Sequence, residues 1–414
     1  MGQVEELVII GAGPAGLAAA AAARSLDPLV LECGTFAQDR NQNDPASVLQ
    51  GVGGAGLFSD GKFSFWPSAS ALWQLNSKFL YPAYAWFTKL LESVGISVPN
   101  LPRKLPAQLP AHVIGEKRYL SLDSSFHDRE YLIDRLAGRI AKLTTQASVS
   151  RLSDSTGDWK VFLKSGAAIS TRRVILATGR LGPLLAREWL PTQTMRALRF
   201  EAGVRIEQPA AEFFLAGHPQ LDPKYVWRNR EGTVEWRTFC CCRQGKIVEA
   251  DFDALTTACG RADCPPTGRS NVGFNVRLLD PAEAVATQRH LLSAARQLTH
   301  PVRQRLDDFL DDVREERDGP LAKLLGRALS ARLAKGLQLL MQQFAGHDLA
   351  NATLVGPTVE GVGLYPIHDQ LLATPARELW VAGDVAGTFR GLTAALISGH
   401  VAGQAVAEAR RSQA

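Results

Sequence analysis

The sequence predicts an α/β fold in which a parallel sheet, built from both ends of the chain, carries a mixed α+β region between its parts. A short apolar strand at 6–10 runs into a glycine-rich turn and an Ala-rich helix at 14–25, and a second strand follows at 29–32. Residues 350–414 return to strand, glycine turn and helix. Alternating runs and well-capped helices lie between these two parts, which is typical of a second sheet with its own helices.

Composition and charge narrow the class of protein. The 414 residues carry a formal net charge of only +5, and Lys and Arg are scattered among acids. This pattern argues against a nucleic-acid-binding surface and is compatible with a small anionic ligand. The apolar stretch 7–23 is interrupted by Gly and Pro, so we expect no membrane span. Six cysteines without an export signal predict reduced thiols and a cytoplasmic protein; the oligomeric state is left open.

The strongest motif is GAGPAG at residues 11–16, between the first strand and the first helix. Gly11 would permit the tight turn, Gly13 would let the backbone approach a pyrophosphate, and Gly16 would let the helix pack closely on the sheet. The helix N-terminus, with Pro14 and Ala15 in its first turn, would offer N–H groups to phosphates. Glu32 ends the next strand and is placed to accept hydrogen bonds from ribose hydroxyls.

This fingerprint fits NAD and FAD equally, and two distant segments favour FAD. ATGR at 177–180 and LWVAGD at 379–384 each place a glycine turn after an apolar strand. An acid at the second turn can bind ribitol hydroxyls, and the helix that follows can direct its N-terminus at the flavin. The alternative is an Ala/Gly helix that simply packs closely. The candidate residues here are Ala177, Gly179, Gly383, Asp384, Gly391, Leu392 and Thr393.

At these motifs the chain resembles two-dinucleotide-binding-motif flavoproteins of the glutathione-reductase type. More narrowly, it resembles a family of FAD-dependent dehydrogenases with few characterised members, through GVGGAGLFSDGKF (51–63), FCCCRQGKIV (239–248), GPTVEGVGLYP (356–366) and GDVAGTFRGLTAALISG (383–399). The chain departs from that family where GDVAGTFRGL replaces a GEG and AGYAGG pattern, and where Cys241 replaces a common Met. These departures concern the substrate that the resemblance would imply, rather than the flavin.

The resemblance implies a Rossmann-like FAD-binding domain of residues 1–65, 125–184 and 350–414, with an inserted substrate domain of 66–124 and 185–349. It also implies that the loop after residue 50 passes close to the isoalloxazine ring, where Lys62 could meet its electron-rich edge; a lysine after a glycine turn is otherwise often a solvated surface residue. The loop residues concerned are Gly54, Ala55, Asp60, Gly61 and Lys62.

Several further elements are expected from pattern and punctuation. A helix over 281 onward has Asp280 as its cap. The other elements are helices at 71–94, 128–143, 301–317 and 320–344, a Pro-punctuated crossing segment at 102–110, a small β-meander over 147–170 that leads to a strand at 174–177, and strands at 201–206, 234–242 and 247–252.

Three classes of function remain open. The first is an FAD-dependent oxidoreductase that passes a hydride to or from flavin N5 on a small anionic or carbonyl-bearing substrate. The others are a monooxygenase that uses NAD(P)H and oxygen, and a non-redox flavoprotein such as an isomerase, hydratase or binding module. Residues 51–56 lack a preceding strand, so we expect no second dinucleotide fold, and electrons would come from the substrate or from transiently bound NAD(P)H.

No side chain is marked out as the catalyst. His368, Tyr365, Lys62 and Arg390 are candidates because they flank the flavin motifs, and a structural role is an alternative for each. The run Cys240–Cys242 lies in an expected strand, so Cys240 and Cys242 would share one face; buried thiols that act as small hydrophobes are the other interpretation. Cys259 and Cys264 fall in a Pro-rich stretch expected to lie away from the flavin motifs, and no spacing predicts a metal site.

Overall fold

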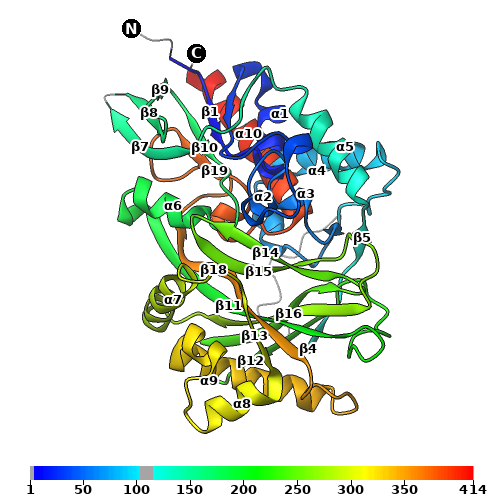
Figure 1. Ribbon diagram of the computed structural model, residues 1–414. Coiled ribbons are helices and arrows are strands. Elements are labelled where there is room, and N and C mark those ends of the chain that lie inside the picture. The colour runs from blue at the N-terminus through cyan, green and yellow to red at the C-terminus, as the bar shows by residue number, and fades with distance from the viewer. Residues whose placement is uncertain (1–3, 103–114, 156, 414) are drawn as a thin grey trace.

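The computed structural model describes residues 4–102, 115–155 and 157–413. Within these ranges, one sheet is parallel and has the order β19 (Leu379–Val381), β10 (Val174–Leu176), β1 (Val8–Ile10), β2 (Leu29–Leu31) and β6 (Lys142–Thr144). Figure 1 shows this sheet in the upper part of the molecule, with β1 from the start of the chain and β19 from its end on either side of β10. The expected α/β fold with a parallel sheet is confirmed.

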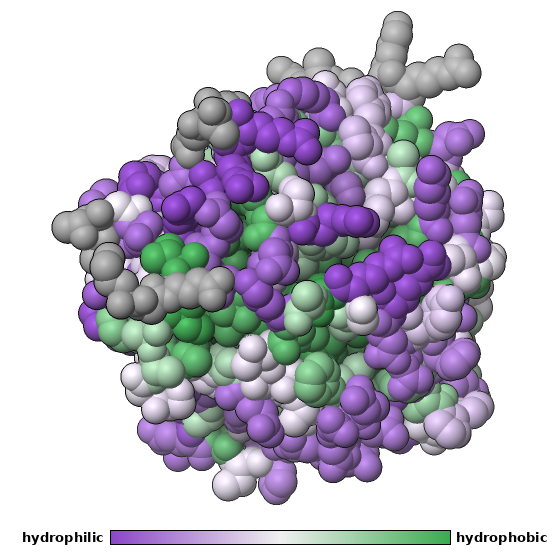
Figure 2. All heavy atoms as spheres, turned by 90° about the horizontal axis from the view of Figure 1, so that it is seen from above, coloured by the Kyte–Doolittle hydropathy of each residue, from purple (hydrophilic) through white to green (hydrophobic). Residues whose placement is uncertain are grey.

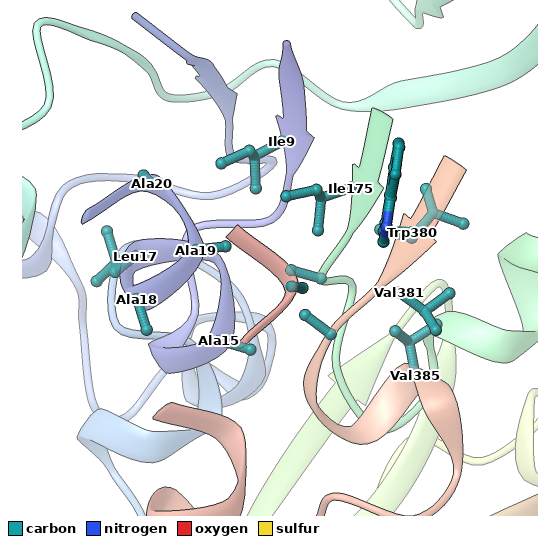
Figure 3. Close-up of a cluster of buried hydrophobic side chains, with 14 of the residues drawn as sticks. Ile9, Ala15, Leu17, Ala18, Ala19, Ala20, Ile175, Trp380, Val381 and Val385 are labelled. Atoms are coloured by element: carbon teal, nitrogen blue, oxygen red, sulfur yellow. The ribbon is translucent and has the colours of Figure 1, made fainter. Parts of the chain in front are cut away.

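The strands of this sheet are apolar because closely packed helices cover and bury them. The helix α1 (Pro14–Ala22) packs against α10 (Leu392–Gln413), and a Cβ on Gly399 would lie 2.1 Å from the Ala15 carbonyl oxygen. Figure 3 shows the small side chains of α1 beside a row formed by Ile9, Ile175 and Trp380 on neighbouring strands. A parallel sheet covered in this way is buried, and its strands are continuously hydrophobic.

Further elements surround this first core. The helices α4 (Ser77–Glu92) and α5 (Phe126–Ala137) add buried side chains to it, and the expected meander is present as β7 (Val149–Ser155), β8 (Asp158–Leu163) and β9 (Ala168–Thr171). The helix expected over 128–143 was wrong at its C-terminal end. It stops at Ala137, and residues 142–144 form the edge strand β6, because pairing with β2 outweighs local helical spacing.

The second sheet of the described residues is antiparallel, and Figure 1 shows it below the first, with helices at its side and beneath it. Its helices are α7 (Pro281–Ala295), α8 (Leu306–Arg314) and α9 (Pro320–Gln343), and the Asp280 carboxylate caps α7 by accepting the Glu283 N–H at 2.8 Å. The strand order is β17 (Val302–Arg305), β18 (Thr353–Pro366), β11 (Met195–Pro209), β16 (Arg269–Leu278), β13 (Val234–Cys242), β12 (Lys224–Arg228) and β4 (Gly115–Lys117).

Short elements connect the two sheets. They include the hairpin β14 (Lys246–Phe252) and β15 (Leu255–Arg261), the pair β3 (Lys62–Ser64) and β5 (Ser121–Asp123), and the helices α2 (Pro45–Leu49), α3 (Gly54–Leu57) and α6 (Gly182–Trp189). Short 3₁₀ turns complete the set at Arg24–Leu26, Ala37–Asp39, Ser70–Gln74, Thr192–Thr194 and Gly383–Ala386.

The two cores divide the chain differently from the expected boundaries. Residues 353–366 pair within the second sheet as β18, although they were expected with the first domain. Conversely, α4 packs in the first core, although 66–124 was expected with the inserted part. Residues 302–305, expected to be helical, form the edge strand β17 because they pair with β18. The crossing segment expected at 102–110 lies outside the described residues, apart from Pro102.

The surface is mixed in character. Figure 2 shows hydrophilic side chains over most of the face seen from above, with apolar patches between them. No helix within the described ranges is long and apolar enough to cross a membrane.

Candidate functional site

A cavity of about 650 Å³ opens where the carboxyl ends of the parallel strands face the second sheet. In open α/β sheets, ligands bind at this edge. The cavity walls include most residues predicted from the sequence: Gly11, Gly13, Pro14, Ala15, Glu32, Gly54, Ala55, Asp60, Lys62, Ala177, Gly179, Asp384, Arg390, Gly391, Leu392 and Thr393. Among the described residues, the predicted ones that do not line it are Gly16, Gly61, Gly383, His368 and Tyr365.

The three glycines of the first turn have different surroundings. Gly11 has a φ of +107°, and a Cβ there would lie 2.5 Å from the Ala177 carbonyl oxygen. A Cβ on Gly16 would lie 1.8 Å from the Gly11 carbonyl oxygen, so this glycine allows close packing within the fold. A Cβ on Gly13 would meet only the Gly54 Cα at 3.7 Å. The Gly13 backbone therefore leaves open space above the N-terminus of α1, which is where a phosphate group would bind.

Glu32 organises the turn from within. Its carboxylate is buried and accepts the N–H groups of Ala12 at 2.8 Å, Gly34 at 3.0 Å and Gly51 at 2.9 Å. These bonds join the glycine turn to the loop that follows residue 50. Its binding of ribose hydroxyls stays a prediction.

Two buried arginines, which the sequence analysis did not identify, hold that loop. Arg40 donates to the carbonyl oxygens of Val52 at 2.9 Å and Gly54 at 2.8 Å. Arg129 donates to the Ser124 carbonyl oxygen at 2.6 Å, and a Cβ on Gly61 would lie 2.6 Å from the Arg129 Nη1 atom. A lone arginine in a sequence gives no sign that it binds backbone carbonyls, so these residues had no detectable signal.

Lys62 joins the loop to the second sheet. Its ammonium lies 3.2 Å from the Asp60 carboxylate and 3.9 Å from that of Asp222, and it donates to the Cys241 carbonyl oxygen. Burial by itself would lower the pKa of Lys62, but the two carboxylates outweigh it and raise the pKa well above its ordinary value. Lys62 is a buried cation in the cavity wall, and the alternative of a solvated surface lysine is wrong.

A row of side chains with alternating charge lines the cavity next to the glycine turns that follow β10 and β19. Arg180 pairs with Glu360, which also pairs with Arg390, and Arg390 donates to the Asp384 carboxylate at 3.0 Å. Burial would lower the pKa of Arg390, but Asp384 and Glu360 raise it above its ordinary value. Arg390 is thus already engaged with two carboxylates. The Asp384 carboxylate lies at the turn where a ribitol group was expected.

The second sheet supplies a wall of polar side chains that no motif indicated. Glu201 is buried and pairs with Arg277 at 2.9 Å. Arg237 and Lys224 lie in the same wall, and burial, with Arg237 nearby, lowers the pKa of Lys224 to about 7. Tyr119 donates its hydroxyl to Asp222 at 2.8 Å. These residues are far apart in sequence, so only the strand register brings them together.

Two of the catalytic candidates lie outside the cavity wall. Tyr365 is buried, and its hydroxyl accepts the Val362 N–H at 2.8 Å. The His368 Nε2 atom lies 3.1 Å from an Arg196 guanidinium nitrogen, and burial lowers the pKa of this imidazole. Neither side chain is therefore placed to touch a ligand in the cavity, whereas Lys62 and Arg390 are.

All six cysteines are free in the structure. Cys240 and Cys242 share one side of β13, as expected, with their Sγ atoms 3.7 Å apart. Cys259 was expected away from the flavin motifs, and this was wrong. It lies on β15, lines the cavity, and accepts a hydrogen bond from Arg180 at 3.4 Å. The hairpin β14–β15 folds back between the two sheets and brings it there.

The residues present fit a dinucleotide cofactor. The open space at Gly13, the nine-residue helix α1 and the cavity size match what such a group needs, since small-molecule sites are typically about 300–1,000 Å³. Gly391, Leu392 and Thr393 bring the start of α10 to the same cavity. The close packing of α10 on α1 is also present, and the direction of its N-terminus towards a flavin stays a prediction.

Similarity to known proteins is found among solved structures. No family model matches the sequence, and no curated protein does either. The solved structure of the Diels-Alderase of pyrroindomycin biosynthesis is 12% identical over 96% of this chain and 63% of its own, with a TM-score of 0.42. A flavoprotein/dehydrogenase from Cytophaga hutchinsonii is 12% identical over 99% of this chain and 79% of its own, with a TM-score of 0.41.

A further solved structure, anhydrotetracycline hydroxylase from Streptomyces rimosus, is 13% identical over all of this chain and 64% of its own, with a TM-score of 0.39. This chain therefore spans less than two thirds of the length of two of these proteins. At these sequence identities and TM-scores, the activities and substrates of the three proteins are not carried over to this chain.

Proposed function

We propose that this protein is an FAD-dependent oxidoreductase that acts on a small anionic or carbonyl-bearing molecule by hydride transfer at flavin N5. One observation carries the proposal: a single cavity joins the glycine turn at the N-terminus of α1, the Asp384 turn and the start of α10 to a charged wall on the second sheet. A long cofactor can lie across the first three features, and its reactive end can then face the fourth.

Each part of the cofactor has a candidate partner. The backbone at Gly13 and the N-terminus of α1 would hold the pyrophosphate, because unpaired N–H groups and the helix dipole favour anions. Glu32 would accept from the adenosine ribose, and Asp384 from the ribitol chain. Bound FAD would supply the hydride-transfer chemistry at this cavity.

The protein's own residues would bind and orient the substrate. Lys224 and Arg237 lie in the second-sheet wall, where they can attract a carboxylate or polarise a carbonyl oxygen. With its pKa lowered to about 7, Lys224 can hold or release a proton near neutrality. Arg180 and Arg390 are held by Glu360 and mainly fix the shape of the cavity.

The test compares two valine substitutions. Gly13→Val adds a side chain that projects into open space and meets little protein, so the fold should persist while cofactor binding is lost. Gly217→Val is the matched control, because a Cβ there meets nothing within 4 Å and the site is remote from the cavity lining. Flavin absorbance and fluorescence quenching, titrated with FAD, measure binding, and melting temperatures report the fold.

We expect the wild type and Gly217→Val to bind close to one equivalent of FAD, and Gly13→Val to bind at least about tenfold more weakly, equivalent to about 1.4 kcal/mol, at an unchanged melting temperature. Wild-type protein that takes up no FAD would refute the proposal. Undiminished binding by Gly13→Val would refute the assigned pyrophosphate position.

The reaction class is tested on the loaded protein. Anaerobic bleaching of the flavin absorbance by a candidate substrate, or by NADH or NADPH, supports an oxidoreductase. Oxygen consumption that is driven by NAD(P)H and coupled to a hydroxylated product would show a monooxygenase instead. Turnover without any change in redox state would show a non-redox flavoprotein.

A further inference from the structure

Two thiols of β13 lie side by side at the cavity. The pairing of β13 with β16 shifts between Phe239 and Cys242, and Cys240 has a φ of +50° within this irregularity. The Sγ atoms of Cys240 and Cys242 are therefore only 3.7 Å apart. Cys240 lines the cavity, and Cys242 is fully buried behind it. A small rotation about the side-chain bonds would bring the two sulfurs to bonding distance.

A buried guanidinium accompanies the pair. Arg205 is 1% exposed and donates to the Cys240 carbonyl oxygen at 2.7 Å, to Asn271 at 2.6 Å and to the Cys242 Sγ at 3.6 Å. Within the described ranges it forms no ion pair with a carboxylate, although a buried cation normally needs an anion. The sulfurs of Cys240 and Cys242 are the groups placed to supply that negative charge.

The thiol pKa values agree with this geometry. The hydrogen bond from Cys240, followed by the charges of Arg205 and Lys62, lowers the pKa of Cys242 despite its burial. The same hydrogen bond, together with burial, raises the pKa of Cys240. These directions favour the thiolate on Cys242 over that on Cys240, and thiolates are the reactive form in disulfide chemistry.

The backbone around the pair is fixed from the opposite side. The Cys241 N–H donates to the Asp222 carboxylate at 3.0 Å, and the Cys241 carbonyl oxygen accepts from Lys62. These contacts hold the bulge in the shape that turns the two neighbouring thiols to the same side. Cys241 itself is buried on the other side of the strand.

We propose that Cys240 and Cys242 form a redox-active dithiol that exchanges two electrons with the flavin, an inference that rests on the FAD-binding function proposed above. In the oxidising direction, the Cys240 S–H bond breaks and an S–S bond forms between the two sulfurs. Two electrons and the Cys240 proton pass to oxidised FAD, so the thiol, the thiolate and FAD give a disulfide and the reduced flavin anion. The reverse step returns the pair to its reduced state.

The experiment follows the tryptic peptide 238–243, which holds all three neighbouring cysteines. Wild type, Cys240→Ser, Cys242→Ser and the control Cys241→Ser are exposed anaerobically either to bound oxidised FAD or, as FAD-free protein, to diamide. They are then unfolded in acid, alkylated and analysed by mass spectrometry. We expect wild type to fall from three alkyl groups to one, and Cys241→Ser to fall from two to none. Cys240→Ser and Cys242→Ser should each keep both.

Three results would overturn the inference. Full alkylation of the wild-type peptide after both treatments would show that the thiols do not pair, and full alkylation of Cys241→Ser would show that Cys241 takes part. Formation of the Cys240–Cys242 disulfide with diamide but not with bound FAD would refute the proposed electron exchange with the flavin. Flavin absorbance of the starting protein is recorded first, so a failure to bind FAD is seen separately as a failure of the proposed function.

Discussion

The contact between Lys62 and Asp222 is the sharpest test of how the two halves of the cavity are joined. Lys62 follows the loop of the first sheet, whereas Asp222 and the Cys241 carbonyl belong to the second. In Lys62→Met, the carboxylates of Asp60 and Asp222 lose their cation, and the Cys241 carbonyl oxygen loses its donor. Met has similar volume, so the change removes charge with little loss of packing.

The expected cost follows from burial. Lys62 is 6% exposed and Asp222 is 8% exposed, so Lys62→Met leaves the buried Asp222 carboxylate without this cation, with only the Tyr119 hydroxyl and the Cys241 N–H as its hydrogen-bond donors. Breaking such a pair from one side costs about 3–5 kcal/mol. Asp222→Asn leaves a buried ammonium that still has Asp60, and should cost less. The double variant removes both charges, so its loss should be smaller than the sum of the single losses by about 1–3 kcal/mol.

Urea unfolding of the wild type, both single variants and the double variant measures this coupling through the transition midpoints. Additive losses, within about 0.5 kcal/mol, would refute the inferred pairing. A second readout is pH. Lys62, Lys224 and the backbone N–H of Cys241 outweigh burial and hold the pKa of Asp222 at about 2. The stabilisation is therefore present above about pH 4 and is lost as the pH falls towards 2, so the gap between wild type and Lys62→Met should narrow there.

Two further outcomes are expected. Lys224 is half-buried and has its pKa lowered to about 7, so its charge destabilises the fold below that pH, and the cost falls as the pH rises from about 7 towards 10. Lys224→Met should therefore gain stability over wild type at pH 6 and lose most of that advantage by pH 10, and a gap independent of pH would contradict this. A Cβ on Gly336 would lie 2.2 Å from the Trp236 ring, so Gly336→Ala should lower the free energy of unfolding in urea by about 1–3 kcal/mol. A Cβ on Gly346 would meet nothing within 4 Å, so the control Gly346→Ala should change it by less than about 0.5 kcal/mol. Equal effects of the two variants would refute the packing of α9 on the second sheet.

The sequence was sufficient to predict those parts of the cavity wall that are formed by neighbouring residues. The glycine turn at 11–16 lies between a strand and a helix that are adjacent in sequence, so its shape follows from φ and from the space that Gly11 and Gly16 leave free. The turns before Gly179 and Gly383 could be placed in the same way, because parallel strands end at the same edge of a sheet.

Long-range pairing overrode local pattern elsewhere. Residues 142–144 and 302–305 have helical spacing, yet each forms an edge strand because a neighbouring strand offers backbone hydrogen bonds. Propensity differences of a few tenths of a kcal/mol per residue cannot compete with such pairing.

What the sequence by itself determined is the parallel sheet and the half of the cavity that its glycine turns line, since these depend on short runs of neighbouring residues. Only the tertiary structure decided the other half. Three strands that are far apart in sequence, β11, β12 and β13, carry Glu201, Arg205, Lys224, Arg237 and the Cys240 thiol, and the antiparallel register places them at one wall. The chemistry of that wall depends on burial and on charges a few ångströms apart, and neither quantity exists until distant segments pack together.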